Sequence, residues 1–131
     1  MKFMLMMNCP RNVEATLASW KPEEFQAHVQ FMLRLNDELR QRGELVLAEG
    51  LDMPTAARIV RGQTDGPPLV TDGPFAEAKE FLAGFWIVDC VSRERAVEIA
   101  GQASLAPGPG GKPMGIPIEL RQVMQAPECD A

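Results

Sequence analysis

The chain has 131 residues, of which 46% are hydrophobic and 24% charged, and its formal net charge at pH 7 is -5. Its length and composition are those of an ordinary globular domain, which needs no metal or disulfide to stabilise it. Because the net charge is negative and the Lys and Arg residues are scattered, we expect no direct binding to nucleic acid and no binding to an anionic membrane.

The chain begins with a strongly apolar segment, residues 1–7, which ends at Asn8 without a cleavage site of small residues. This pattern predicts a strand rather than a signal peptide. No stretch approaches the ~20 apolar residues of a membrane span. Within residues 2–8, apolar side chains occupy both odd and even positions, which predicts a strand covered on both faces. We expect residues 1–126 to form one domain and residues 127–131 a frayed tail.

Cys9, Cys90 and Cys129 lie far apart and lack the C-x-x-C spacing of zinc and redox sites. Widely spaced thiols, odd in number, favour a reducing, cytoplasmic location. We expect no bound metal and no cofactor.

A loop is predicted over residues 9–20, followed by a long helix. Pro22 suits the first helical turn, and the two glutamates after it favour the positive end of the helix. The helix is predicted to run from Pro22 to about Arg42 and to end at Gly43. Its predicted apolar face comprises Phe25, His28, Val29, Met32, Leu35 and Leu39.

His28 is the only histidine of the chain and lies within this apolar face. A histidine in such a place is more often a hydrogen-bonded core residue than a catalyst. It is also the side chain that exchanges a proton near neutral pH without strong perturbation. Both interpretations remain open from the sequence.

Strands are predicted over residues 44–51, 55–61 and 69–71, and turn residues at 62–68 join the last two in a hairpin. The hairpin ends at the sequence Thr-Asp-Gly-Pro-Phe, residues 71–75. Asp-Gly and Gly-Pro are both turn dipeptides, so the acid is held at a strand end on a stiff turn beside an aromatic ring. This geometry suits a ligand site, and it also suits a purely structural turn.

The remaining elements are predicted in order as one or two helical turns within residues 75–82, a strand over 84–91 that is apolar on both faces, a helix over 93–103 capped by Ser92, and a strand over 118–124. A Gly/Pro-rich loop over residues 104–117 precedes the last strand. It contains a Gly-Lys pair, but proline follows Lys112 and a helix comes before the loop, which excludes a phosphate-binding loop.

The order strand, helix, strand, hairpin, strand, helix, strand predicts an α+β domain on a βαβ-βαβ plan with an inserted β-hairpin. Its helices are expected on one face of a mostly antiparallel sheet. Two helices cover only one face, whereas the first and fifth strands are apolar on both. We therefore predict a homodimer in which the open faces of two sheets pack together.

Several segments resemble the YCII-related family and, more narrowly, its DGPF-motif branch. They are residues 2–6, the helix start at Pro22, residues 43–46, and above all residues 70–75 together with Gly84-Phe85-Trp86. The resemblance implies a ferredoxin-like, dimeric α+β barrel. It also implies that the chain is related to small-molecule lyases and dehydrochlorinases with a His-Asp pair, and to proteins encoded beside extracytoplasmic-function sigma factors.

The first functional hypothesis is an enzyme of small-molecule chemistry, in which a histidine base and an acid that orients its ring remove a proton and drive an elimination. Its candidate residues are His28 and Asp72 as the catalytic pair, Lys79 or Arg58 as the group that holds an anionic part of the substrate, and Gly73, Pro74 and Phe75 as further ligand-binding residues. The second hypothesis is a non-catalytic dimer that binds a small ligand or takes part in a sigma-factor pathway, with residues 104–117 as a contact surface. A third interpretation makes residues 72–75 a structural turn alone.

Overall fold

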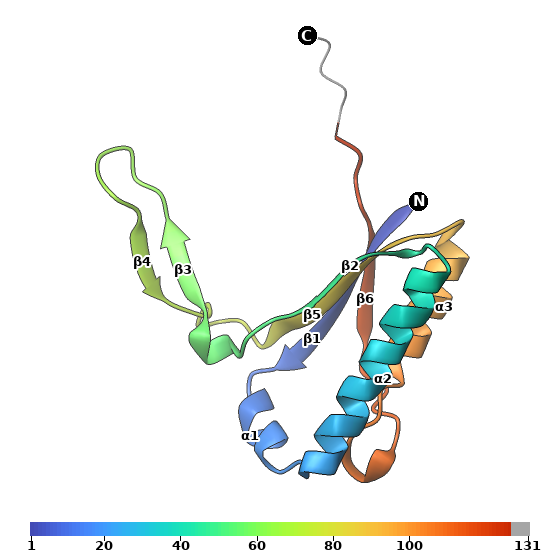
Figure 1. Ribbon diagram of the computed structural model, residues 1–131. Helices are drawn as coiled ribbons and strands as arrows, with labels where there is room; N and C mark the ends of the chain where they lie inside the picture. The colour runs from blue at the N-terminus through green and yellow to red at the C-terminus, as the bar shows by residue number, and fades with distance from the viewer. Residues whose placement is uncertain (127–131) are drawn as a thin grey trace.

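The computed structural model describes residues 1–126, and the tail predicted over residues 127–131 lies outside them. The elements are, in order, β1 Lys2–Pro10, α1 Val13–Ala18, α2 Pro22–Gln41, β2 Leu45–Gly50, β3 Arg58–Arg61, β4 Leu69–Asp72, β5 Glu80–Asp89, α3 Arg93–Ser104 and β6 Ile118–Gln122, with 3-10 turns at Pro54–Ala56 and Pro109–Gly111 (Figure 1). This order confirms the predicted α+β plan with an inserted hairpin.

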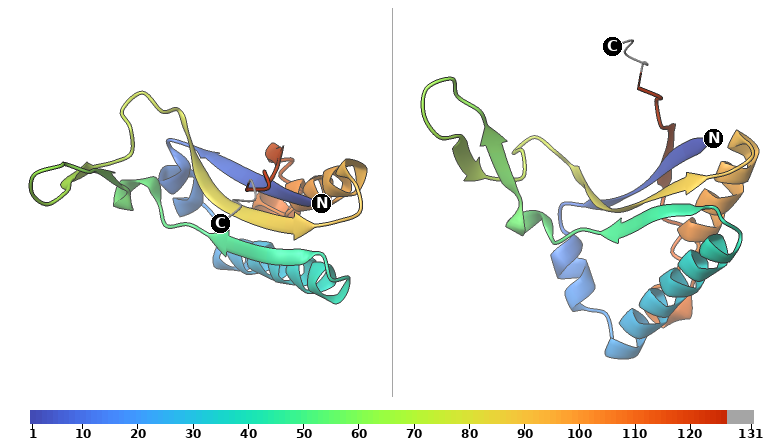
Figure 2. Two further views of the ribbon diagram at one scale, coloured as in Figure 1. Left: turned by 90° about the horizontal axis from the view of Figure 1, so that it is seen from above. Right: turned by 45° about the horizontal axis from the view of Figure 1, so that its top comes forward.

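The main sheet contains four antiparallel strands in the order β2-β5-β1-β6. The central pair runs the full length of β1, from Lys2 opposite Asp89 to Pro10 opposite Glu80. The two long helices, α2 and α3, pack against the same face of this sheet (Figure 2). This is the ferredoxin-like arrangement that the family resemblance implies, and it agrees with the order of elements.

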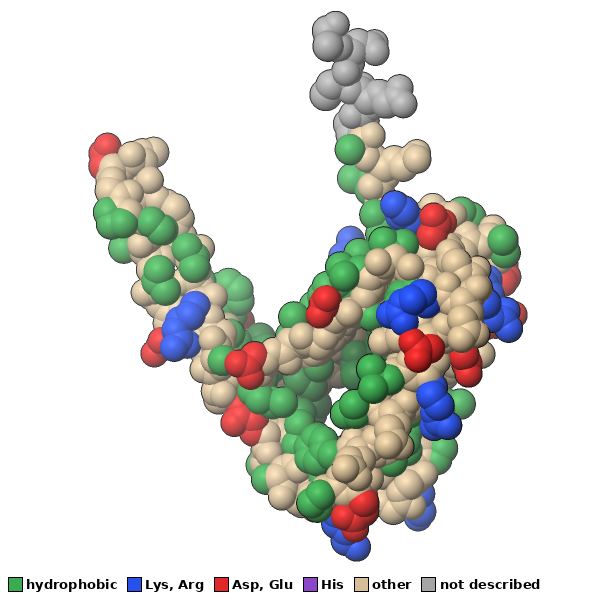
Figure 3. Space-filling model, viewed as in Figure 1, with side chains coloured by type: hydrophobic (Ala, Val, Ile, Leu, Met, Phe, Trp, Pro, Cys, Tyr) green, Lys and Arg blue, Asp and Glu red, His purple; other side chains and the backbone are tan. Residues whose placement is uncertain are grey.

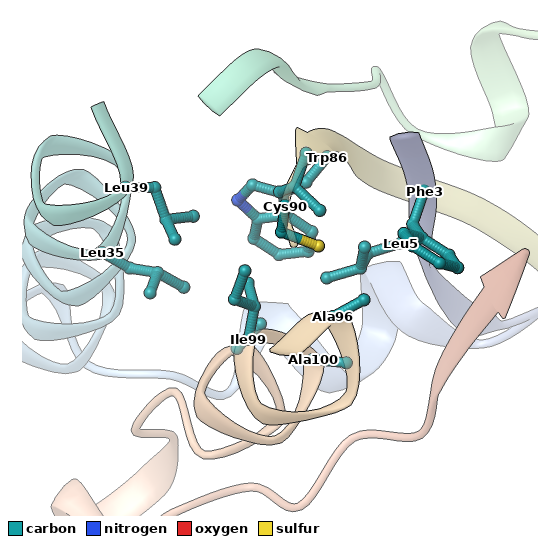
Figure 4. Close-up of a cluster of buried hydrophobic side chains, with 11 residues drawn as sticks. Phe3, Leu5, Leu35, Leu39, Trp86, Cys90, Ala96, Ile99 and Ala100 are labelled. Carbon is teal, nitrogen blue, oxygen red and sulfur yellow. The ribbon is translucent and has the colours of Figure 1, made fainter. Parts of the chain in front are cut away.

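The core lies between the two long helices and the sheet, as Figure 4 shows. Alternate residues of each central strand point toward the helices, because successive side chains of a strand lie on opposite faces. Phe3 and Leu5 of β1 lie opposite Val88 and Trp86 of β5 in this way. The largest fully buried side chains are Phe3, Leu5, Leu39, Val88 and Ile99. Burial of this apolar surface is the main source of stability.

The predicted range of α2 is confirmed. At its start, the Lys21 N–H donates to Glu24 Oε1 over 2.8 Å. After its end, Gly43 has a φ of 71°, the left-handed region that favours glycine. The prediction that Val29 lies on the apolar face is wrong, since its side chain is 51% exposed. Val29 is one residue, ~100° around the helix, from His28, which places it beyond the stripe that faces the sheet.

Two local predictions are also wrong. Residues 13–18, expected to be loop, form the short helix α1, which follows Asn12, a residue type preferred at N-caps, but buries no residue. Residues 75–79, expected to be helical, form turns, and β5 begins at Glu80 because this residue pairs with Pro10 of a longer β1.

The hairpin β3–β4 forms a separate two-stranded sheet that projects from the body of the protein (Figures 1 and 2). We call residues 58–72 the arm. Its strands pair from Arg58 opposite Asp72 to Arg61 opposite Leu69. Apolar side chains on it are largely solvent-exposed: Val60, Leu69 and Val70 are 62%, 52% and 59% exposed.

The central strands β1 and β5 are apolar on the sheet face opposite the helices, as predicted, whereas the edge strands add Glu49, Glu119 and Arg121 to this face. We call it the open face, and its apolar residues are Met4, Met6, Leu47, Phe85 and Ile87. Since both α2 and α3 lie on the other side of the sheet, these side chains remain partly exposed. Among residues 1–126, the structure has no helix that is both long and apolar enough to cross a membrane.

Candidate functional site

Two adjoining cavities lie where α2, α1 and the sheet meet. Figure 3 shows hydrophobic side chains gathered around a hollow in this region. The first, which we call the Asn36 cavity, has a volume of about 300 Å³, and the second, the Trp20 cavity, about 310 Å³. Met7, His28 and Ala83 line both. Together the cavities reach the size of a small-molecule site.

His28 stands at the boundary of the two cavities, in the second turn of α2. Its Nδ1 lies 3.0 Å from the carbonyl oxygen of Pro107. A carbonyl oxygen only accepts hydrogen bonds, so Nδ1 carries the proton and donates it. In the neutral ring Nε2 is then unprotonated and able to accept a proton. The edge-on ring of Trp20, at 5.6 Å between centroids, packs against the imidazole.

The loop that supplies this carbonyl is held against the start of α2. Gly110 N–H donates to Glu24 Oε2, and Ile116 N–H donates to Ser104 O over 3.1 Å. Hydrogen bonds from the backbone N–H groups of Lys21 and Gly110 lower the pKa of the Glu24 carboxyl below its usual value. These hydrogen bonds hold the loop to its own domain, although residues 109–115 at its tip remain exposed.

The lining of both cavities is almost free of charge. Glu49 is the one charged residue that lines either of them. Ala48 pairs with Trp86, whose side chain faces the helices, whereas Glu49 pairs with Phe85 on the open face. Strand alternation therefore directs the Glu49 carboxylate away from the helix side. A neutral, largely apolar molecule suits this lining better than an anion does.

The structure places the predicted acid, Asp72, at the end of β4 in the arm. Its side chain is 92% exposed, and its Oδ1 lies 3.6 Å from Arg58 Nε. Asp72 lines neither of the cavities that His28 lines. Within one chain the structure does not bring the acid to His28, so their pairing stays a prediction.

The other predicted ligand-binding residues also lie outside the cavities. Gly73 abuts Ala57: its N–H donates to Ala57 O over 2.9 Å, and a Cβ on it would lie 3.1 Å from Ala57 Cβ. The peptide bond from Gly73 to Pro74 is cis. Phe75 is 60% exposed, and Lys79 is exposed. These contacts are those of a tight turn at the base of the arm.

Comparison with known proteins identifies the family. The model of the YCII-related domain matches residues 1–108. The chain belongs to the YCII-related family. A curated protein of Rhizobium meliloti (strain 1021), described as uncharacterized, is 34% identical over 95 residues, which covers 72% of this chain and 76% of the relative. The matched domain includes His28, the arm and the carbonyl of Pro107.

In this YCII-related chain, Arg11 fixes the segment that follows the turn, a role that sequence reasoning missed. Its Nη2 donates to the carbonyls of Phe75 and Ala76, each over 3.1 Å, and its Nε donates to Ala78 O over 3.2 Å. Its guanidinium also lies 5.4 Å from the ring centroid of Phe81. Arg11 thus ties the turn region to the end of β1, beside the Trp20 cavity.

Sequence reasoning also missed Trp20 and Asn36, which line the two cavities of the YCII-related domain. Asn36 follows His28 by two steps of four residues, and this helical spacing was the available signal. Cys9 lines the Trp20 cavity as well, but burial raises the pKa of its thiol, which disfavours a nucleophilic thiolate. Within residues 1–126, no group of three or more His, Cys, Asp or Glu side chains is placed to hold a metal ion.

Proposed function

We propose that this YCII-related domain binds a neutral, largely apolar small molecule in the two cavities and that His28 is the proton acceptor there. The observation that carries the proposal is the geometry of His28. Its Nδ1–H is held by Pro107 O at 3.0 Å, and the ring lines both apolar cavities. A fixed ring with one free nitrogen is the arrangement that a general base requires.

The chemistry we propose is an elimination of the lyase type. His28 Nε2 takes a proton from a carbon next to an electron-withdrawing group, and the electron pair of that C–H bond forms a new double bond. The leaving group departs with its own bonding pair. The resulting imidazolium keeps its hydrogen bond to the Pro107 carbonyl. A positioned general base contributes about 10²–10⁴ in rate.

Asp72 remains in the proposal, but no longer as the acid that orients the His28 ring. The Pro107 carbonyl occupies Nδ1, the position at which an acid would orient the ring. We propose that the catalytic and ligand-binding roles of the arm and turn residues are exerted across a dimer, where an arm reaches a second subunit and where Lys79 and Arg58 donate hydrogen bonds to a neutral ligand. These residues are Asp72, Gly73, Pro74, Phe75, Lys79 and Arg58.

The test is a thermal-shift screen of small neutral molecules, each paired with an anion of the same shape. A ligand that binds the native state at a hundred times its Kd adds about 2.7 kcal/mol of stability. We expect neutral compounds to raise Tm and their anionic partners not to. Ala83→Leu narrows both cavities and is expected to abolish the shift, whereas Ala76→Leu, at an exposed site outside them, is the matched control.

Any reaction found with such a ligand is then measured in His28→Gln, which keeps an amide donor for Pro107 but has no basic nitrogen. A loss of turnover with retained binding supports the base role. Turnover that survives in this variant, or a thermal shift that survives Ala83→Leu, rejects the proposal.

A second proposal is a non-catalytic homodimer that binds a ligand or acts in an extracytoplasmic-function sigma-factor pathway, within the DGPF-motif branch. The open face, whose apolar side chains remain partly exposed, supports the dimer. Met6→Asp puts a charge in this face and is expected to yield a monomer, whereas Glu119→Asp, opposite Met6 on β6, keeps the charge there and should remain dimeric. A wild-type monomer by light scattering at micromolar concentration rejects the dimer.

The sigma-factor role is tested separately, because it concerns another protein. A specific sigma factor that co-purifies with the chain supports it. The exposed residues 109–115 of the loop over residues 104–117 are the candidate contact. We also propose a cytoplasmic location, consistent with the free thiols of Cys9 and Cys90.

A further inference from the structure

Asn36 presents a hydrogen-bond donor to the cavity that bears its name. Its Oδ1 accepts the indole N–H of Trp86 over 2.8 Å. An indole nitrogen only donates, so this bond fixes which end of the amide is oxygen and which is nitrogen. Asn36 is half-buried, and among residues 1–126 no group accepts a hydrogen bond from its Nδ2. Two N–H donors are therefore available to a molecule in the cavity.

Asn36 and His28 lie toward opposite ends of the cavity. Both residues line the Asn36 cavity from α2, with Met32 between them. They are eight residues apart, a rise of ~12 Å along the helix axis. The cavity thus has a proton acceptor toward one end, an amide donor toward the other, and an apolar wall between them.

We propose that Asn36 is a specificity-determining residue that donates a hydrogen bond from Nδ2 to a neutral acceptor oxygen, such as that of a ketone, ester, amide or nitro group. This inference rests on the proposed function, since it concerns a ligand of the same site. It narrows the ligand class to elongated apolar molecules, on the order of 10 Å long, with an acceptor oxygen at the end away from His28.

The chemistry of the cavity excludes other uses of this donor. A carboxylate or phosphate would also accept from an amide, but no Lys or Arg lines either cavity to balance its charge. A wholly apolar ligand would leave the two N–H groups without a partner, which costs binding energy. A neutral oxygen acceptor satisfies both conditions.

The fixed amide makes a sharp substitution possible. Asn36→Asp has the same shape, and its carboxylate still accepts the Trp86 N–H. The change therefore keeps the structural hydrogen bond and replaces the free donor by an acceptor. Measured at about pH 8, well above the usual pKa of Asp, the introduced group is ionised.

The probes are Prodan, a neutral fluorescent naphthyl ketone, and dimethylaminonaphthalene, the same ring system without the ketone. In the wild-type protein we expect Prodan to bind about tenfold or more tightly than dimethylaminonaphthalene. We expect Asn36→Asp to weaken the binding of both probes, because each covers an unbalanced carboxylate, and to weaken Prodan more, because only its ketone loses a hydrogen bond and meets a like charge. The emission of bound Prodan is expected to shift to shorter wavelength in the variant, because its ketone loses a hydrogen bond.

The outcomes separate the two proposals. Suppose that both probes bind the wild-type protein equally well and that Ala83→Leu abolishes the binding of both. The cavity then binds ligands, but the inference about Asn36 is wrong. If neither probe binds, or if Ala83→Leu leaves binding intact, both proposals fail. The comparison of the two probes in wild type decides the matter even if Asn36→Asp does not fold.

Discussion

The hydrogen bond from Trp86 Nε1 to Asn36 Oδ1 is expected to stabilise the fold as well as to orient the amide. The bond is 2.8 Å long, and Trp86 is 6% exposed. Asn36→Ala leaves a buried indole donor without a partner, so the free energy of unfolding should fall by about 1–3 kcal/mol. Trp86→Phe removes the donor and part of a buried ring, and it should cost a similar amount, about 1–3 kcal/mol.

The two changes should not add. In the double variant neither partner is left unpaired, so its loss of stability should be smaller than the sum of the single losses by about 1 kcal/mol. Urea unfolding of the four proteins, analysed with a common m value, measures this coupling. A coupling energy within about 0.3 kcal/mol of zero would refute the argument, since independent sites add to within that amount.

Three further predictions concern the core, an ion pair and the turn. Ile99→Ala should lower the free energy of unfolding by about 2–5 kcal/mol, because the side chain is 0% exposed, whereas Val97→Ala, at a site 55% exposed on the same helix, should change it by about 0.5 kcal/mol or less. The Glu44 carboxylate accepts hydrogen bonds from the half-buried Arg95 of α3, and these bonds are the main reason that its pKa is lowered. Glu44 therefore stabilises the protein above the usual Glu pKa of about 4.3, and this stabilisation is lost as pH falls through the lower pKa of the folded state. Glu44→Gln should make the stability of the protein depend less on pH in this acid range. Arg11→Ala should speed limited proteolysis within residues 75–79, because three carbonyls lose their charged donor.

Each of these has a clear contrary result. Equal losses in Ile99→Ala and Val97→Ala would contradict the packing described for α3. A stability that depends as steeply on pH in this acid range in Glu44→Gln as in wild type would assign acid sensitivity to other carboxyls. Unchanged cleavage in Arg11→Ala, with Arg34→Ala as the control at an exposed helix site, would show that the turn holds its shape without Arg11.

Much of the fold could be predicted from residue types that mark the ends of helices. Ser92 was predicted to cap a helix, and its Oγ accepts from the Arg95 N–H over 3.1 Å. Gly43 was predicted to end α2 and has the left-handed backbone that this position requires. The short helix α1 escaped notice because it has six residues, no capping bond and no buried residue, so no periodic pattern marks it.

The site was only half predictable for a different reason. His28 was recognised by its place on the apolar face of α2, which is a pattern of side chains. Its partner is the backbone carbonyl of Pro107, 79 residues away. Every residue has a backbone carbonyl, so the residue type at position 107 does not identify it as the partner of His28. Asp72 was instead singled out because its turn is conspicuous in the sequence, and the structure gives that turn close contacts with Ala57 and Arg11.

The arm has a consequence for the dynamics of the protein. Within the described residues its two strands pair only with each other, and a lone two-stranded hairpin is at best marginally stable in water. Its amide hydrogens should therefore exchange with solvent well before those of β1 and β5, which lie in the centre of the main sheet. If a second protein slows the exchange of these amide hydrogens, it binds the arm.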